Sequence, residues 1–227
     1  HPLVAELDGQ LAGCANGLRN GNAGWLGNII VLPEFRGRGI GHALTAELVE
    51  FFRARGVVHQ ILIATKLGEP VYRKLGFETV AQYVFMKRET DGAPEPAAGV
   101  RQATALDYPA ILALDRVLTG EQRAPFLGRF LADARVHVSP SGAVDGFYLP
   151  ALANGPVLAE NEAAGLALLA SRLGDGAHTA VVPEANAAAL DFLQRRGFVE
   201  TARAPRMALG PDAAWRPTSV YGRGAGY

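Results

Sequence analysis

The sequence predicts an α/β (α+β) protein with two tandem domains, each a mixed, mostly antiparallel sheet flanked by helices. Three observations support this fold class. A segment rich in proline, glycine and alanine divides the 227 residues. Apolar runs with strand character alternate with runs of helical spacing, and several features recur in the same order on both sides of the division.

The length and the hydrophobic content of 49% allow one large domain or two small ones. The dividing segment, Glu89–Gly99, offers a core almost nothing to bury. We therefore expect a first domain at 1–90, a linker at 91–99, a second domain at 100–210 and a C-terminal tail at 211–227.

Three features repeat across this division. The run Tyr72–Phe77 (Tyr-Arg-Lys-Leu-Gly-Phe) aligns with Leu193–Phe198 (Leu-Gln-Arg-Arg-Gly-Phe), and in each copy a methionine lies ten positions after the glycine. Upstream, Asp8–Gly13 corresponds to Ser141–Gly146. Three anchors in the same order indicate a duplicated domain.

The first copy is predicted to contain strand, strand, strand, helix, strand, helix and strand, in that order. The first two strands are joined by Asp8-Gly9, whose preference for positive φ is typical of a tight hairpin. The long helix has apolar residues at helical spacing and ends at Gly56. The predicted ranges are Leu3–Leu7, Leu11–Ala15, Trp25–Val31, about 41–56, Val57–Ala64, about 70–76 and Gln82–Arg88.

The second copy begins with additional elements. Between Val100 and about Ala134 it carries two helical apolar patterns that have no counterpart ahead of Leu3. The first copy is therefore expected to be N-terminally incomplete, without its first strand and two helices. Either the natural N-terminus is absent from this sequence or the domain is shorter, and His1 as first residue favours the former.

The composition argues against several classes of partner. The 22 basic and 22 acidic side chains cancel, so we expect neither nucleic acid nor an anionic membrane as the main partner. Cys14 is the single cysteine, and no apolar stretch has the length of a membrane span or the pattern of a signal peptide. We expect a cytoplasmic protein without a metal, and the many arginines and alanines suggest a bacterial one.

A glycine-rich run, Arg36–Gly41, lies between a predicted strand and the long helix. Glycines let backbone N–H groups approach a pyrophosphate, and a helix N-terminus and arginines favour its charge. A Walker loop requires Gly-Lys-Ser/Thr, and a dinucleotide fingerprint requires a further glycine and a later acidic residue. His42 and Thr65 stand at the places of that glycine and acid, so neither motif applies.

The full run Val31–Gly41 reads Val-Leu-Pro-Glu-Phe-Arg-Gly-Arg-Gly-Ile-Gly. It resembles the signature of the GNAT (Gcn5-related N-acetyltransferase) superfamily, whose second element, Tyr-x-x-x-Gly-Phe, is present as Tyr72–Phe77. The tandem arrangement and the Arg206-Met207 ending look like bacterial acetyltransferases of the YitH type.

This resemblance implies acetyl-CoA as cofactor and a direct transfer to an amine. The backbone of Ile29, Ile30 and Val31 would pair with the pantetheine arm, and Tyr72 would protonate the leaving thiolate. Thr65 stands where relatives have an asparagine. The pyrophosphate would be held by Arg36, Gly37, Arg38, Gly39, Ile40 and Gly41, with His42 beside it or solvated.

The second copy has a different subset of the family's site residues from the first. Asn186 stands seven residues before Leu193, so the asparagine is present whereas the tyrosine is replaced. After Gly155–Ala159 the chain enters a helix without a glycine cluster. We expect this half not to bind acetyl-CoA in the usual way and instead to shape or close the acceptor site.

Some assignments remain open at this level. Tyr72 could simply pack its helix on the sheet, and Cys14 fits a small strand residue better than a nucleophile. The strand Trp25–Val31 has no acid to act as general base. That base could come from a preceding segment, the second domain or a water, or an amine of low pKa could need none.

We therefore predict an N-acetyltransferase that moves the acetyl group of acetyl-CoA to a primary amine of a small molecule or peptide. One alternative is a tandem-GNAT acyl or aminoacyl transferase with another acceptor. The other is a non-catalytic acyl-CoA sensor.

Overall fold

The computed structural model describes residues 1–90, 97–211 and 214–223, so most of the expected linker and the end of the tail lie outside the described residues. The chain forms two compact units. The first unit contains His1–Ala81 and the described residues of 204–213. The second unit contains Gln82–Arg203 and the described residues of 214–225.

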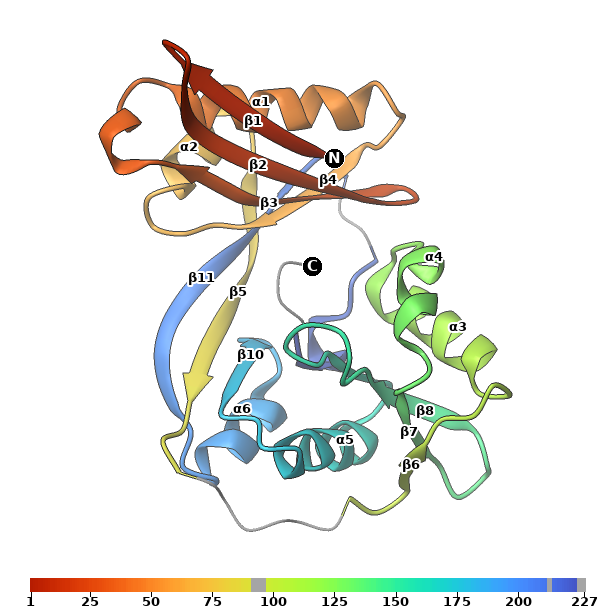
Figure 1. Ribbon diagram of the computed structural model, residues 1–227. Coiled ribbons are helices and arrows are strands. Elements are labelled where there is room, and N and C mark those ends of the chain that lie inside the picture. The colour runs from red at the N-terminus through yellow and green to blue at the C-terminus, as the bar shows by residue number, and fades with distance from the viewer. Residues whose placement is uncertain (91–96, 212–213, 224–227) are drawn as a thin grey trace. The chain divides into compact units, whose positions relative to one another are not determined.

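The first unit has the predicted order of elements (Figure 1). A short 3-10 turn, Pro33–Phe35, precedes its long helix, and β11, a strand from the second half of the sequence, joins its sheet. The elements are β1 Pro2–Leu7, β2 Gln10–Asn20, β3 Ala23–Val31, α1 Ile40–Arg53, β4 His59–Ile63, α2 Glu69–Lys74, the start of β5 Glu78–Lys87 and the end of β11 Val199–Leu209.

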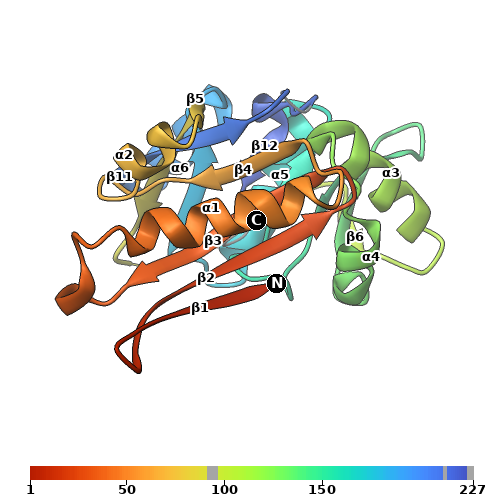
Figure 2. The ribbon, with the colours of Figure 1, turned by 90° about the horizontal axis from the view of Figure 1, so that it is seen from above.

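Helix α1 covers one face of this sheet and runs along β2 and β3 (Figure 2). Its buried residues include Leu44, Leu48 and Phe52. A Cβ atom at Gly17 or Gly24 would lie only 2.9 and 2.8 Å from the Phe52 ring. Glycine on the facing strands therefore lets α1 lie close to the sheet.

The second unit repeats the same order and adds the extra N-terminal elements that the sequence predicts. Among the described residues, no helix is long and apolar enough to span a bilayer. The elements are β6 Val100–Gln102, α3 Tyr108–Thr119, α4 Ala124–Leu127, β7 Arg135–Val138, β8 Val144–Tyr148, β9 Val157–Ala159, α5 Glu162–Gly174, β10 Thr179–Pro183, α6 Ala187–Gln194 and β12 Val220–Gly222, with 3-10 turns at Gly128–Phe130 and Pro217–Ser219.

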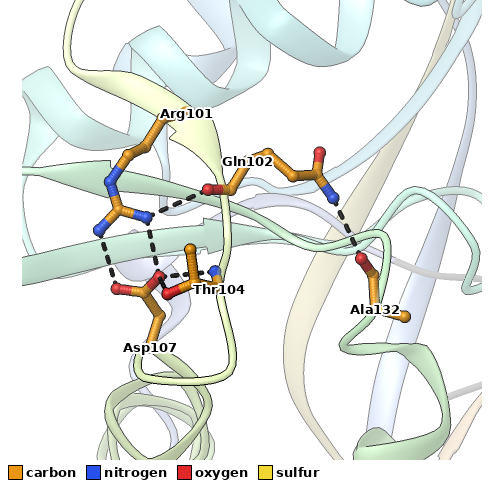
Figure 3. A network of polar contacts seen from close by, with 5 residues as sticks. All are labelled: Arg101, Gln102, Thr104, Asp107 and Ala132. Atoms are coloured by element: carbon orange, nitrogen blue, oxygen red, sulfur yellow. Dashed lines mark hydrogen bonds and ion pairs between the residues drawn. The ribbon is translucent and has the colours of Figure 1, made fainter.

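A polar network anchors the added helix α3 (Figure 3). Asp107, the residue before α3, accepts hydrogen bonds from the Thr104 backbone N–H at 2.7 Å and the Thr104 hydroxyl at 2.9 Å. The Arg101 guanidinium donates two hydrogen bonds of 2.8 Å to the same carboxylate. These donors favour the charged form and hold the pKa of Asp107 well below its usual range.

Strands β5 and β11 are exchanged between the units, because each runs from one unit into the other. The seven-stranded sheet has the order β1-β2-β3-β4-β11-β5-β10, and β12-β9-β8-β7-β6 form a second sheet. In β11, Met207 pairs with Leu62 of β4 and lies in the core of the first unit. In β5, Met86 pairs with Ala180 of β10 and lies in a core of the second unit. The compact units are therefore not the contiguous ranges 1–90 and 100–210 expected from sequence.

Candidate functional site

The predicted site lies where two parallel strands of the first unit diverge. Strands β3 and β4 pair only over Ala23–Trp25 and His59–Ile61. Beyond these residues β3 continues to Val31 and β4 to Ile63 without further pairing between them. The facing edge of Ile29–Val31 is thus outside the ladder with β4, and an extended amide-bearing chain could hydrogen-bond to it.

A β-bulge shapes the same stretch of β3. Cys14 pairs with Ile30 and Asn16 with Gly27, so Ala15 faces both Asn28 and Ile29. Asn28 has φ of 51°, a left-handed conformation that asparagine tolerates better than most residues. The sequence predicts a regular strand here, and this asparagine is the one local signal for the bulge.

The half-buried Cys14 thiol lies 3.8 Å from the Asn28 carbonyl oxygen, to which it donates a weak hydrogen bond. The cysteine thus contacts the bulge through its thiol, and this contact fits the structural reading of the residue.

The turn after β3 is held against the end of the strand. The Arg36 Nε donates to the Val31 carbonyl oxygen at 3.1 Å. The Arg38 guanidinium carbon lies 5.7 Å from the centroid of the Phe35 ring. Both arginines are exposed, so two positive charges are available at the surface of this turn.

The start of α1 leaves its first backbone N–H groups accessible to a ligand. Gly37 and Gly39 have φ of 77° and 81°, and a Cβ atom at either would meet nothing within 4 Å. Gly39 is the N-cap residue and provides no side-chain cap. The N–H groups of Ile40, Gly41 and His42 lie in the first helical turn, where the helix offers them no acceptor. The region therefore favours an anion.

Tyr72 lies on α2, after the second of the diverging strands. Its side chain belongs to the core of the first unit, is 7% exposed, and contacts the Phe77 ring edge-on at a centroid distance of 6.2 Å. Burial raises the pKa of the Tyr72 phenol. The packing role and a proton-donating role are compatible, because burial favours the neutral phenol, whose hydroxyl lies beside Gly68.

Gly68 contacts Tyr72, although the sequence does not single out this glycine as functional. A Cβ atom at this position would lie 2.8 Å from Tyr72 Cε2 and 2.9 Å from its hydroxyl oxygen. The backbone of Gly68 has φ of −82° and ψ of −30°, which any residue adopts. Glycine is thus required here by the space that Tyr72 occupies.

Thr65 has a local role in the turn before α2. Its hydroxyl accepts a hydrogen bond from the Gly68 backbone N–H at 3.1 Å. In the second unit, Asn186 Oδ1 accepts the equivalent bond from the Ala189 N–H at 3.0 Å. Asn186 is the N-cap residue of α6, whereas Thr65 closes the turn ahead of Gly68, the N-cap residue of α2. Thr65 is exposed at the same strand end as the predicted cofactor site.

The counterpart of α1 in the second unit has a different start. Asn161 caps α5 by accepting a hydrogen bond from the Ala164 N–H at 3.0 Å. Its amide also donates to Asp145 at 2.9 Å, and Glu162 occupies the first turn. Side chains of the protein itself thus satisfy the positive end of α5, in contrast to the glycine-capped α1.

Comparison with known families identifies the class of protein. Two models, each described as an acetyltransferase (GNAT) domain, match the chain over residues 1–79 and 111–222. The chain belongs to the GNAT acetyltransferase superfamily and carries two of its domains in tandem. Members of this family are generally acyltransferases that use acyl-CoA donors.

Individual relatives agree with this assignment. An acetyltransferase of Pectobacterium atrosepticum is 37% identical over 89 residues, which cover 38% of this chain and 63% of the relative. A glucosamine 6-phosphate N-acetyltransferase of Trypanosoma brucei brucei is 40% identical over 60 residues, covering 26% of this chain and 41% of the relative. The chain thus spans less than two thirds of the length of these relatives.

Solved structures show the shared fold. A putative acetyltransferase from Pyrococcus horikoshii aligns with a TM-score of 0.85 at 22% identity and covers 99% of this chain and 78% of its own. A tandem GNAT protein from the clavulanic acid biosynthesis pathway aligns with a TM-score of 0.58 at 18% identity, covering 93% and 83%.

Proposed function

We propose that the first unit binds acetyl-CoA and transfers its acetyl group to a primary amine of a small molecule or peptide. One observation carries this proposal. Three features lie at the C-terminal ends of the neighbouring parallel strands β3 and β4. They are the diverging edge of β3, the glycine-capped start of α1 and the helix α2, which bears Tyr72. Those ends lie at one edge of the sheet, so the three features can serve one ligand.

Each part of the site fits one part of acetyl-CoA. The backbone of Ile29, Ile30 and Val31 would hold the amides of the pantetheine arm, and the bulge at Asn28 would set their direction. The turn Arg36–Gly41 and the adjacent His42 would hold the pyrophosphate. When bound, the cofactor supplies an acetyl thioester, which an amine can attack directly.

Tyr72 is the group we assign to proton transfer. Its raised pKa keeps the phenol protonated at neutral pH, so it can donate a proton to the sulfur as the thiolate leaves. Thr65 and Gly68 position the turn that places this side chain. The general base remains one of the alternatives set out from the sequence, since β3 carries no carboxylate.

A non-catalytic acyl-CoA sensor is the second candidate, and the absence of an acid from β3 is the observation that favours it. Measurement of coenzyme A thiol release with acetyl-CoA and a panel of amines separates the two. The enzyme should release thiol at a rate that saturates with at least one amine. Binding of acetyl-CoA without thiol release on any amine would support the sensor instead.

A further inference from the structure

The C-terminal strand β12 occupies a distinctive place in the second unit. Strands β9 and β10 precede α5 and α6, as β3 and β4 precede α1 and α2. β12 pairs antiparallel with β9 through Val220 opposite Leu158. On its other side, the Arg223 backbone N–H donates to the Val181 carbonyl oxygen of β10 at 2.9 Å. β12 thus bridges the two strands whose counterparts diverge in the first unit.

Asn186 ties the segment before and within β12 to the start of α6. Its amide nitrogen donates hydrogen bonds to the carbonyl oxygens of Thr218 at 2.9 Å and Val220 at 3.0 Å. Asn186 is also the counterpart of Thr65, which stands beside the cofactor site proposed for the first unit. The asparagine of the second copy is therefore satisfied by backbone of the same chain.

Tyr221 fixes β12 on its helical side. The residue is 3% exposed and belongs to a core of the second unit. Its ring lies so close to α5 that a Cβ atom at Gly165 would be 2.2 Å from two ring carbons. The absence of a side chain at Gly165 thus leaves space for the Tyr221 ring. Strand β12 is held by backbone hydrogen bonds, by the Asn186 amide and by packing of this ring.

We propose that β12 occupies the gap between β9 and β10 and closes it to a pantetheine arm. This gap, called the slot below, is the counterpart of the acyl-CoA site proposed between β3 and β4 of the first unit. An extended backbone offers the N–H donors and carbonyl acceptors that the amides of pantetheine would offer, so the two compete for the same strand edges. The inference rests on the proposed function, because the slot is defined by its counterpart in the first unit.

The test releases β12 and asks whether pantetheine takes its place. Asn186→Asp keeps the oxygen that caps α6 but replaces the amide donor by an acceptor facing two carbonyl groups, which should expel β12. Asn161→Asp is a control for the loss of a capping amide, because it makes the same change at the cap of α5, where the new carboxylate faces Asp145 rather than carbonyl groups of the β12 segment. Gly165→Ala is a second release variant, since alanine favours the helix whereas its methyl group displaces the Tyr221 ring.

Amide hydrogen exchange of the full chain provides the readout. Both release variants should show exchange about tenfold faster in β9, β10 and β12, and millimolar pantetheine should restore the protection of β9 and β10. The wild-type protein should show neither effect, and in Asn161→Asp the exchange of β10 and β12 should stay slow. If pantetheine leaves β9 and β10 unprotected after β12 is released, or if neither release variant loosens β12, the proposal is overturned. Protection of Ile29–Val31 in the same spectra reports the first-unit site separately.

Discussion

Among single residues, the proposed acetyl transfer depends on the hydroxyl of Tyr72. Replacing Tyr72 with Phe should lower kcat by about 10² or more, because the proton donor to the leaving thiolate is lost whereas the ring packing against Phe77 is kept. Affinity for acetyl-CoA should be nearly unchanged. Thiol-release kinetics and calorimetry measure the two quantities. Tyr148→Phe, which removes a hydroxyl bonded to Asp175 in the second unit, is the control and should leave kcat intact.

The raised pKa of Tyr72 also sets a pH dependence. The phenol is a proton donor only below its pKa, and burial moves that pKa above the ordinary value of about 10. As the pH rises through the neutral range, loss of this proton should therefore not reduce kcat. If kcat falls above about pH 10 in the wild-type protein but not in Tyr72→Phe, the decrease is due to ionisation of Tyr72. The same fall in the Phe variant would assign it elsewhere.

Gly68→Ala tests the position of the hydroxyl independently. The added methyl group would stand 2.9 Å from the Tyr72 hydroxyl oxygen, so the ring has to move, although the backbone conformation of Gly68 suits alanine. We expect kcat to fall about tenfold or more with little change in the affinity for acetyl-CoA. Steady-state kinetics at saturating acetyl-CoA measure this, and an unchanged kcat would show that the hydroxyl position does not matter.

At the scale of elements, the start of α1 is the feature to alter. Gly39→Ala places a Cβ atom at a residue with positive φ, which costs about 1–2 kcal/mol of stability. The same Cβ atom lies on the open side of the turn, where the pyrophosphate would bind. The Kd for acetyl-CoA should rise about tenfold or more, equivalent to about 1.4 kcal/mol.

Gly56→Ala is a matched control for that variant. Gly56 has φ of 70° and its Cβ would also meet nothing within 4 Å, but it lies just beyond the other end of α1. The two substitutions should cost similar stability, which thermal unfolding measures, and only Gly39→Ala should weaken binding. Equal losses of affinity would mean that the effect is general destabilisation.

The order of elements could be predicted from sequence because it depends on local signals. Apolar periodicity marks α1, and the hairpin dipeptide Asp8-Gly9 marks the turn between β1 and β2. The divergence of β3 from β4 and the bulge at Asn28 could not be predicted in the same way, because both are properties of pairing between strands. The contact of Gly68 with Tyr72 likewise appears only once the helix is folded.

At the scale of the whole molecule, the exchange of strands makes each unit depend on the other half of the sequence. Met207→Ala should remove a buried side chain from the core of the first unit, and Met86→Ala from a core of the second, each at a cost of about 2–5 kcal/mol. Hydrogen exchange should then quicken in α1 for Met207→Ala and in α5 for Met86→Ala. The reverse assignment would contradict the exchanged topology.

Met86 and Met207 align in the sequence, but this alignment does not reveal which core each residue enters. Strands β5 and β11 follow equivalent Gly-Phe dipeptides, and the choice of partner depends on pairing with β10 or β4, far away in the chain. The position of β12 could not be predicted for the same reason, since the three residues of this strand contain no local pattern that indicates pairing with β9.

The two units are proposed to differ in acetyl-CoA binding, and calorimetric titration of the full chain with acetyl-CoA measures this difference. We predict one acetyl-CoA per chain, with binding weakened by Gly39→Ala in the first unit and unaffected by Asn161→Ala at the corresponding helix of the second. Two sites per chain, or a single site weakened by Asn161→Ala and not by Gly39→Ala, would contradict it.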